Sequence, residues 1–146
     1  MPAGTPQQST WSRKQMEKAF AHHQAGRLKE AESYYRQVIR LEPDEPDANN
    51  LLGVLLFQSQ RSTEGLPYLE RATRVKPSES MFFHNYAVAL RASGKVQEAI
   101  AAFARCVELQ PNQADAMSTL VDLLLKQKRH AEAAGYLKKL VALKPL

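Results

Sequence analysis

The histidines are the residues of this chain whose chemistry could support metal binding or acid–base catalysis, and they stand at His22, His23, His84 and His130. A metal site needs several ligands that converge and are held by surrounding hydrogen bonds, whereas adjacent residues of a helix point about 100° apart. The sequence also has no glycine-rich phosphate loop, no GxSxG motif and no HExxH motif. We therefore predict no catalytic residue, no metal site and no cofactor, and we expect that the chain is not an enzyme.

The only cysteine, Cys106, excludes an internal disulfide framework. A chain without disulfides fits a reducing compartment, and we predict a cytoplasmic location. No run of about 18 apolar residues is present, so no membrane span is expected. The first residues are rich in proline, glycine and glutamine, which predicts a flexible tail at residues 1–10 and not a signal peptide.

The net charge of +5 raises nucleic acid as a possible partner. Basic residues crowd the last quarter of the chain, at Lys126, Lys128, Arg129, Lys138, Lys139 and Lys144. They are not interleaved with exposed aromatic residues, and this pattern is more typical of a solvated face. We predict that nucleic acid is not the partner.

Four prolines recur every 34 residues and indicate one small unit used several times. They are Pro43, Pro77, Pro111 and Pro145. A column of helix-capping residues follows the same interval, at Thr10, Asp44, Ser78 and Asn112. Such side chains accept hydrogen bonds from the unpaired N–H groups of a first helical turn. Four helices are therefore expected to start at this column.

Columns of small residues face a column of large ones at the same interval. The small columns are Ala19, Gly53, Ala87 and Val121, and Ala31, Gly65, Ala99 and Ala133. The large column is Tyr35, Leu69, Phe103 and Leu137. Small residues that face large ones allow two helices to lie close together. Each unit therefore reads as a pair of helices.

The turn between the helices of each pair falls at Gly26, Gln60, Gly94 and Lys128. Glycine tolerates the positive φ that such a reversal uses, so the turns at Gln60 and Lys128 are expected to be strained or differently shaped. Pro67 lies near the start of a second helix and is expected to fray its first turn.

These residues resemble the tetratricopeptide repeat family, whose unit is a helix-turn-helix of this length with small contact residues and a closing proline. The resemblance covers residues 11–145 and is best at Leu52, Gly53, Leu56, Ala72 and Pro77, and at Tyr86, Ala87, Gly94, Ala99, Phe103 and Pro111. It implies an all-α fold, a right-handed α-solenoid of four antiparallel helix pairs. The domain would cover residues 11–146, with repeats at about 12–45, 46–79, 80–113 and 114–146.

The resemblance also implies a concave groove lined by the first helix of each pair. The predicted partner-binding residues are Met16, Phe20, Asn50, Leu51, Val54, Phe57, Met81, His84, Asn85 and Val88. The same count places Glu17, His23 and Arg91 in the groove. Family members that bind chaperone tails hold a carboxylate with basic and amide side chains, and here apolar residues replace that clamp at Met16, Phe20, Leu51 and Met81. The apolar positions favour an amphipathic helix or apolar peptide, although some of them could belong to the core.

We predict a protein-interaction scaffold that binds a peptide or helix of a partner protein in this groove. The alternative is the targeting or substrate-recruiting arm of a larger enzyme, of the glycosyltransferase, sulfotransferase or hydroxylase type. A third possibility is self-association through the last helix, which carries an uncapped apolar stripe at Leu137, Leu140, Val141 and Leu143.

Overall fold

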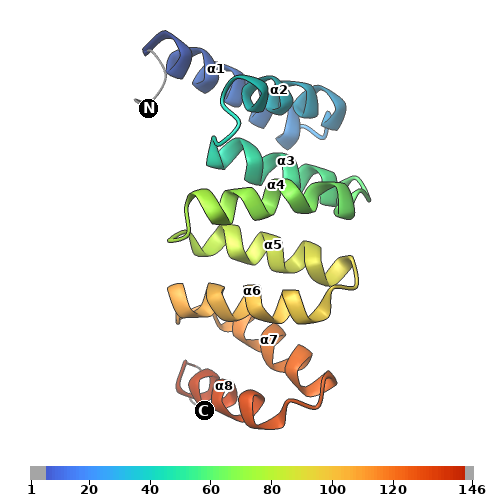
Figure 1. Cartoon of the computed structure of the whole chain (residues 1–146), viewed down its shortest axis with the longest axis vertical. Coiled ribbons are helices and arrows are strands. Elements are labelled where there is room, and N and C mark those ends of the chain that lie inside the picture. Colours follow the sequence, from blue (N-terminus) through green and yellow to red (C-terminus); the bar gives the residue numbers. More distant parts are fainter. Residues whose placement is uncertain (1–5, 144–146) are drawn as a thin grey trace. The chain divides into compact units, whose positions relative to one another are not determined.

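The structure is a computed structural model that describes residues 6–143, with side chains from Thr10 onward. Every regular element in this range is an α-helix (Figure 1). The helices are α1 (Pro6–Gln24), α2 (Leu28–Leu41), α3 (Pro46–Gln58), α4 (Ser62–Val75), α5 (Ser80–Ala92), α6 (Val96–Leu109), α7 (Ala114–Lys126) and α8 (His130–Leu143). The predicted all-α fold of helix pairs is therefore confirmed.

The helices form two compact units that divide between Val75 and Lys76, and each unit contains two antiparallel helix pairs. In unit 1, α1 pairs with α2, α3 pairs with α4, and α2 also packs on α3. Its core is apolar and fully buried, at Ala19, Ala31, Tyr35, Leu52, Leu55 and Leu56. Burial raises the pKa of the Tyr35 hydroxyl to about 12, so this side chain stays neutral in the core.

The closest approach in unit 1 is between α3 and α4 and depends on two glycines. A Cβ added to Gly65 would lie 2.8 Å from the carbonyl oxygen of Gly53. A Cβ added to Gly53 would lie 2.6 Å from Cδ2 of Leu69. Real Cβ atoms do not approach other atoms this closely, so a Cβ at Gly65 would force the backbone of α3 to shift and a Cβ at Gly53 would force the Leu69 side chain to move. The predicted pairing of small and large columns is confirmed here.

In unit 2, α5 pairs with α6, α7 pairs with α8, and α6 packs on α7. Phe103, Cys106, Leu120 and Leu124 are buried between these helices. Cys106 is fully buried in this core, and burial raises the pKa of its thiol.

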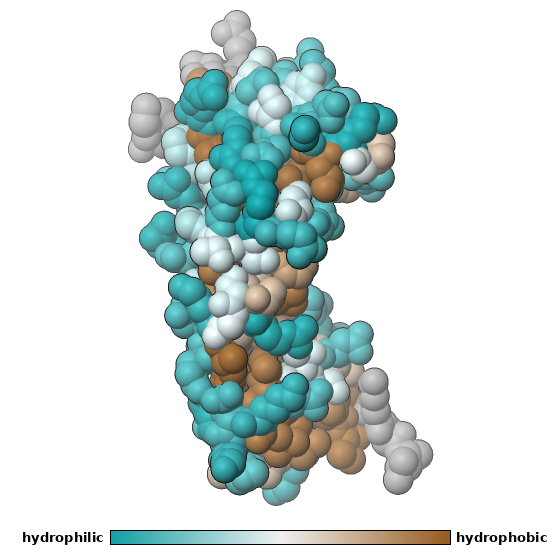
Figure 2. Space-filling model, turned by 90° about the vertical axis from the view of Figure 1, so that its right-hand side faces the viewer, coloured by the Kyte–Doolittle hydropathy of each residue, from teal (hydrophilic) through white to brown (hydrophobic). Residues whose placement is uncertain are grey.

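The last helix is the least buried of unit 2, because Ala133 is its only fully buried residue. Leu137 is 40% exposed and Val141 is 63% exposed. In Figure 2 hydrophobic residues gather on the lower part of unit 2. The apolar stripe predicted for the last helix is therefore exposed, and Leu137 departs from the buried column formed by Tyr35, Leu69 and Phe103.

All four turns within the helix pairs use the same left-handed backbone. Gly26 and Gly94 have φ values of 79° and 77°, and Gln60 and Lys128 have φ values of 64° and 60°. A non-glycine residue pays roughly 1–2 kcal/mol for this conformation. The turns at Gln60 and Lys128 thus have the same sign of φ as the glycine turns, and carry the predicted strain.

The predicted helix N-caps are wrong by one residue. The helices α3, α5 and α7 begin after Glu45, Glu79 and Gln113, each of which follows the predicted capping residue. The cause is a tight turn that contains each repeated proline, in which the N–H of Glu45, for example, donates to the carbonyl oxygen of Glu42. Asp44 instead forms an ion pair with Arg71, at 3.2 Å.

Two further sequence predictions need correction. The helix α1 begins at Pro6, so Thr10 is no cap and residues 6–10 of the predicted tail are helical, while residues 1–5 lie outside the described residues. The helix α4 continues through Pro67 without fraying. At the sixth position Pro67 removes only the N–H that would bond to the carbonyl of Thr63, so the first turn remains intact.

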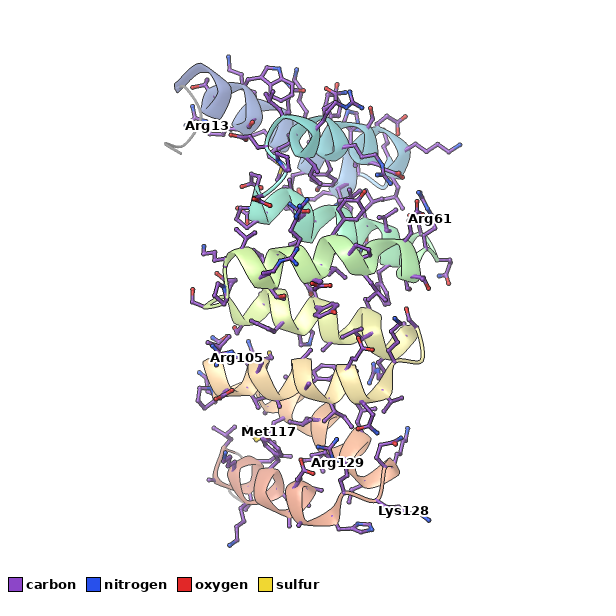
Figure 3. All side chains as sticks on the ribbon, in the orientation of Figure 1. Arg13, Arg61, Arg105, Met117, Lys128 and Arg129 are labelled. Carbon is purple, nitrogen blue, oxygen red and sulfur yellow. The ribbon has the colours of Figure 1, made fainter. Side chains whose placement is uncertain are left out.

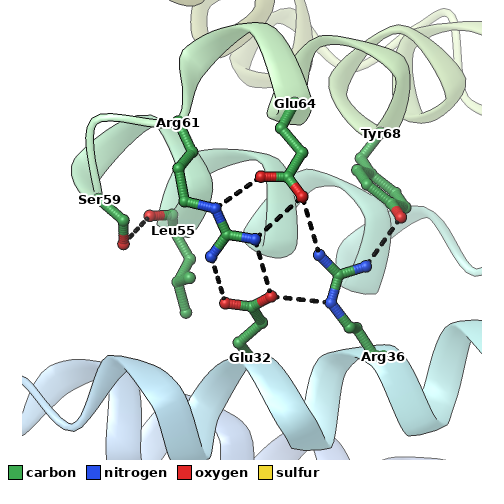
Figure 4. Close-up of polar contacts among 7 residues, drawn as sticks. All are labelled: Glu32, Arg36, Leu55, Ser59, Arg61, Glu64 and Tyr68. Carbon is green, nitrogen blue, oxygen red and sulfur yellow. Dashed lines mark hydrogen bonds and ion pairs between the residues drawn. The ribbon is translucent and has the colours of Figure 1, made fainter.

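A cluster of charged side chains joins α2 to the start of α4 in unit 1 (Figure 4). Arg61 donates to Glu32 at 2.8 Å and to Glu64 at 2.6 Å, and Arg36 donates to Glu32 at 2.8 Å and to the Tyr68 hydroxyl at 3.0 Å. The hydrogen bond from Arg61, more than the one from Arg36, holds the pKa of the Glu32 carboxyl below its ordinary value. The cluster therefore ties the two helix pairs of unit 1 together.

In unit 2 the equivalent of Arg61 is Arg129, and Figure 3 shows each of them at the turn before the last helix of its unit. Arg129 pairs with Glu132 at 2.7 Å and donates to Gln97 at 2.9 Å. Ile100 and Ala104 replace the residues equivalent to Glu32 and Arg36, so the full cluster belongs to unit 1 alone.

Candidate functional site

The predicted groove residues lie on the first helix of each pair, and all but one of them are at least partly exposed within their own unit. In unit 1, Phe20 is 45% exposed, while Met16, Leu51, Val54 and Phe57 are half-buried. In unit 2, Met81 is 55% exposed, and His84, Asn85 and Val88 are half-buried.

Asn50 is the exception, because it is only 4% exposed. A side chain this deeply buried cannot present its amide to an extended peptide backbone without a rearrangement of α3. The structure therefore gives no support to Asn50 as a contact residue.

Each unit has a hollow at the same place in its repeat. The hollow of unit 1 measures about 320 Å³ and is lined by Ser12, Arg13, Met16, Glu42, Glu45 and Asp47. The hollow of unit 2 measures about 440 Å³ and is lined by Met81, His84, Asn112, Gln113, Ala114, Asp115 and Ala116. Arg13 and Met81, Met16 and His84, Glu45 and Gln113, and Asp47 and Asp115 occupy positions 68 residues, or two repeats, apart. The hollow is thus a repeated feature, between a first helix and the start of the next first helix.

The two hollows differ in charge. Three carboxylates line the hollow of unit 1, those of Glu42, Glu45 and Asp47. Burial, and then the charges of Asp47 and Glu42, raise the pKa of the Glu45 carboxyl, although its hydrogen bond from the N–H of Ala48 acts the other way. In unit 2 the neutral Gln113 replaces Glu45. The first hollow is therefore the more acidic, since Asp115 is the only carboxylate among the described residues that line the second.

A model of the tetratricopeptide repeat matches residues 17–80 and 84–146, which together make up most of the chain. The chain belongs to the tetratricopeptide repeat family. The repeated helix pairs are what this membership requires.

Several known proteins are similar to much of this chain. MamA from Desulfovibrio magneticus RS-1 superimposes with a TM-score of 0.80 at 20% identity, over 91% of this chain and 75% of that one. The Thermobaculum terrenum O-GlcNAc transferase, as its K341M mutant, superimposes with a TM-score of 0.74 at 26% identity, over 83% of this chain and 23% of that one. The peroxisomal targeting signal receptor of Saccharomyces cerevisiae is 28% identical over 93 residues. That match covers 64% of this chain and spans 15% of the receptor's length.

Two histidines of this tetratricopeptide repeat chain, His22 and His23, contact aromatic residues of the neighbouring helix. His23, predicted to face the groove, contacts the Tyr35 hydroxyl with Nδ1 at 3.0 Å and the Gln58 side chain with Nε2 at 2.6 Å. His22 stacks on Tyr34 and accepts a hydrogen bond from Arg27. Among the described residues, no group of three or more histidine, cysteine or acidic side chains could hold a metal ion.

Sequence reasoning missed the buried polar residues beside the hollows. Asn49 is fully buried and donates to the carbonyl oxygens of Pro43 and Glu45, at 3.0 and 2.8 Å, which fixes the turn between the two repeats of unit 1. Ser12, which lines the hollow of unit 1, is also buried. Ser80 is buried too and precedes Met81, which lines the hollow of unit 2. The two serines occupy the same position of the repeat, and this shared position was the sequence signal that could have indicated that they are buried.

A larger hollow, of about 820 Å³, lies away from the first-helix positions predicted to bind a partner. It runs along α2 and is lined by Trp11, Lys29, Glu32, Ser33, Arg36, Gln37, Arg40 and Leu41. Most of these walls are long, solvated side chains, and Glu32 and Arg36 are already engaged in the charged cluster. We assign it no role in binding. Within residues 6–143, no helix has the length and apolar character needed to span a membrane.

Proposed function

We propose that this chain is a protein-interaction module that binds a peptide or amphipathic helix of a partner protein on the surface of its first helices. The observation that supports this most is the exposure of large apolar side chains at predicted contact positions, Phe20 in unit 1 and Met81 in unit 2. Both residues lie on first helices that also carry half-buried apolar residues, such as Met16 and Val88, and contiguous apolar surface of this kind marks contact sites.

Binding on this surface needs no covalent chemistry. The exposed part of an aromatic ring such as Phe20, roughly 100 Å², contributes about 2 kcal/mol when a partner covers it. Met16 and Met81 can adapt their shape to different apolar side chains. The predicted contacts Leu51, Val54, Phe57, His84, Asn85 and Val88 would surround these anchors.

The relationships of the chain support the same function. Membership of the tetratricopeptide repeat family and partial similarity to a receptor for a targeting signal both favour recognition of another polypeptide. We also propose a reducing location such as the cytoplasm, because the thiol of Cys106 is free and buried.

The proposal is tested by selecting peptides from a displayed library on the purified chain. The best peptide is then measured against Phe57→Ala and Phe20→Ala. Each variant should weaken binding by about tenfold, as expected when an aromatic anchor is truncated, without loss of helicity. Leu41→Ala is the matched control, because Leu41 is 47% exposed but lies on a second helix. Equal affinities for all four proteins would contradict the proposed surface.

A second candidate function is the substrate-recruiting arm of a larger enzyme. The observation that favours it is the 26% identity to the O-GlcNAc transferase, of which this chain spans 23%. The sequence encoded beyond Leu146 distinguishes the two candidates, because a catalytic domain there would support the second. Self-association through α8 is a further proposal, supported by the exposure of Leu137, Val141 and Leu143.

A further inference from the structure

The hollow of unit 1 contains a buried hydroxyl without a partner. Ser12 is 5% exposed, and its Oγ makes no hydrogen bond. Ser80 holds the same position in unit 2, and its hydroxyl donates to Oε1 of Gln110 at 2.7 Å. A buried hydroxyl that lacks its hydrogen bond costs roughly 1–3 kcal/mol. Ser12 therefore has a hydrogen-bonding position to offer to a molecule that enters the hollow.

The carboxylates of the same hollow are not neutralised by the protein. Within the described residues, no basic side chain forms an ion pair with Glu42, Glu45 or Asp47. Arg13 lines the hollow without pairing to any of the three, and Figure 3 shows it on the amino-terminal part of α1. Their neighbour Asp44, in contrast, is paired with Arg71.

The carboxylates of this hollow are not ion-paired in the described part of the chain and repel one another, and a cation placed among them relieves this repulsion. The raised pKa of the Glu45 carboxyl reports the same crowding, since burial and the charges of Asp47 and Glu42 all disfavour its ionised form. A metal ion is not the fitting cation, because no set of three suitable ligands exists in residues 10–143.

We propose that the hollow of unit 1 binds the cationic side chain of a lysine or arginine in the partner peptide. The carboxylates of Glu42 and Asp47 accept hydrogen bonds from the cation, and the Ser12 hydroxyl is a third acceptor. A lysine ammonium carries three N–H donors and an arginine guanidinium five, so either can use all three positions. The inference rests on the proposed function, because it assigns one contact of the bound peptide.

Titrations with small probes test the hollow without any knowledge of the partner. The probes are the N-acetyl, N′-methylamide forms of lysine, arginine and norleucine, and binding is followed by backbone amide NMR shifts. The lysine and arginine probes should shift the amides of Ser12, Arg13 and Asp47, and norleucine should not. Their binding should weaken at least about fivefold between about 50 mM and about 500 mM salt, because the contacts are charged. The ratio of the lysine and arginine affinities shows which side chain the hollow prefers.

Variants locate the binding to the predicted atoms. The double variant Glu42→Gln, Asp47→Asn should lose about tenfold or more in affinity for the lysine probe, and Ser12→Ala about threefold. Asp115→Asn is the matched control, because Asp115 holds the position of Asp47 in the hollow of unit 2, and it should change nothing. Glu45 is left unchanged because its side chain caps α3. Equal binding of norleucine and lysine, or full affinity in the double variant, would overturn the inference.

The selected peptide separates this inference from the proposed function. If Phe57→Ala weakens the peptide and the double variant does not, the assignment of the hollow is wrong and the interaction surface stands. If the lysine probe binds to the hollow but Phe20→Ala and Phe57→Ala leave peptide affinity unchanged, the hollow stands and the proposed surface is wrong.

Discussion

Replacement of Gly65 by alanine should destabilise the protein, although alanine is the better helix former. The added Cβ would lie 2.8 Å from the carbonyl oxygen of Gly53 and 3.2 Å from Cβ of Leu56. Backbone atoms of a packed helix cannot move aside easily, so we expect a cost in the upper part of the usual range for overpacking, roughly 2–3 kcal/mol. The gain in helix propensity returns about 1 kcal/mol. Gly65→Ala should therefore lower the free energy of unfolding by about 1–2 kcal/mol.

Gly135 is the matched control for this prediction. It lies inside α8, and a Cβ added there would have no atom within 4 Å. Gly135→Ala should therefore raise the free energy of unfolding by roughly 0.5–1 kcal/mol. At about 3 °C per kcal/mol, the melting temperatures of the two variants should differ by about 5–9 °C, with opposite signs relative to the parent chain. Circular dichroism during heating and urea unfolding measure both. A Gly65→Ala protein as stable as its parent would refute the close contact between α3 and α4.

Two further predictions concern stability in acid and assembly. The pKa of Glu32 is lowered in the folded state, so the stabilisation by its ion pairs is present above its ordinary value near 4.5 and is lost as the pH falls through the lower folded value. Glu32→Gln should accordingly cost about 1 kcal/mol at neutral pH, and urea titrations should show this difference shrinking toward pH 3, whereas a constant difference would contradict the role of its charge. For self-association through α8, sedimentation of the parent chain should show a mass that rises with concentration, and Val141→Glu should abolish the rise. A parent chain that stays monomeric at the highest concentration would remove this proposal.

The sequence predicted the helix pairs well because their signals are local and repeated. The 34-residue interval places Ala31, Gly65, Ala99 and Ala133 in one column, and all four are buried. The turns follow for the same reason, since a reversal at Gly26 and Gly94 requires an equivalent reversal at the other two positions. In a repeat protein each helix contact and each turn is therefore encoded several times in the sequence.

Prediction from the sequence failed where two neighbouring residues could take the same role, or where one side chain could point either to the groove or to the core. Asp44 and Glu45 are both acidic and both precede α3. Glu45 is the cap because the tight turn that contains Pro43 ends at Glu45. Asn50 matches the groove column by count, but its side chain is buried in the structure. Such choices depend on packing between helices, which a periodic pattern does not resolve.

The hollows were out of reach of the sequence for a related reason. Ser12 and Glu42 are 30 residues apart, and nothing local to either one indicates that they line the same cavity. Their juxtaposition follows from the packing of α1 beside the turn between α2 and α3. The structure is also needed to show that the Ser12 hydroxyl is unpaired whereas the Ser80 hydroxyl is bonded. This contrast shows that the first hollow has an unused hydrogen-bonding position.

The most direct test of the central claim, that partners bind on the first helices, is site-specific photo-cross-linking with the selected peptide. A photoreactive phenylalanine analogue is placed at Phe20 and at Phe57, and, as controls on second helices, at Leu41 and at Val75, which are 47% and 40% exposed. The adducts are located by mass spectrometry. We predict covalent adducts at the two first-helix positions and none at the two controls. Adducts at Leu41 or Val75, with none at Phe20 and Phe57, would contradict the proposed binding surface.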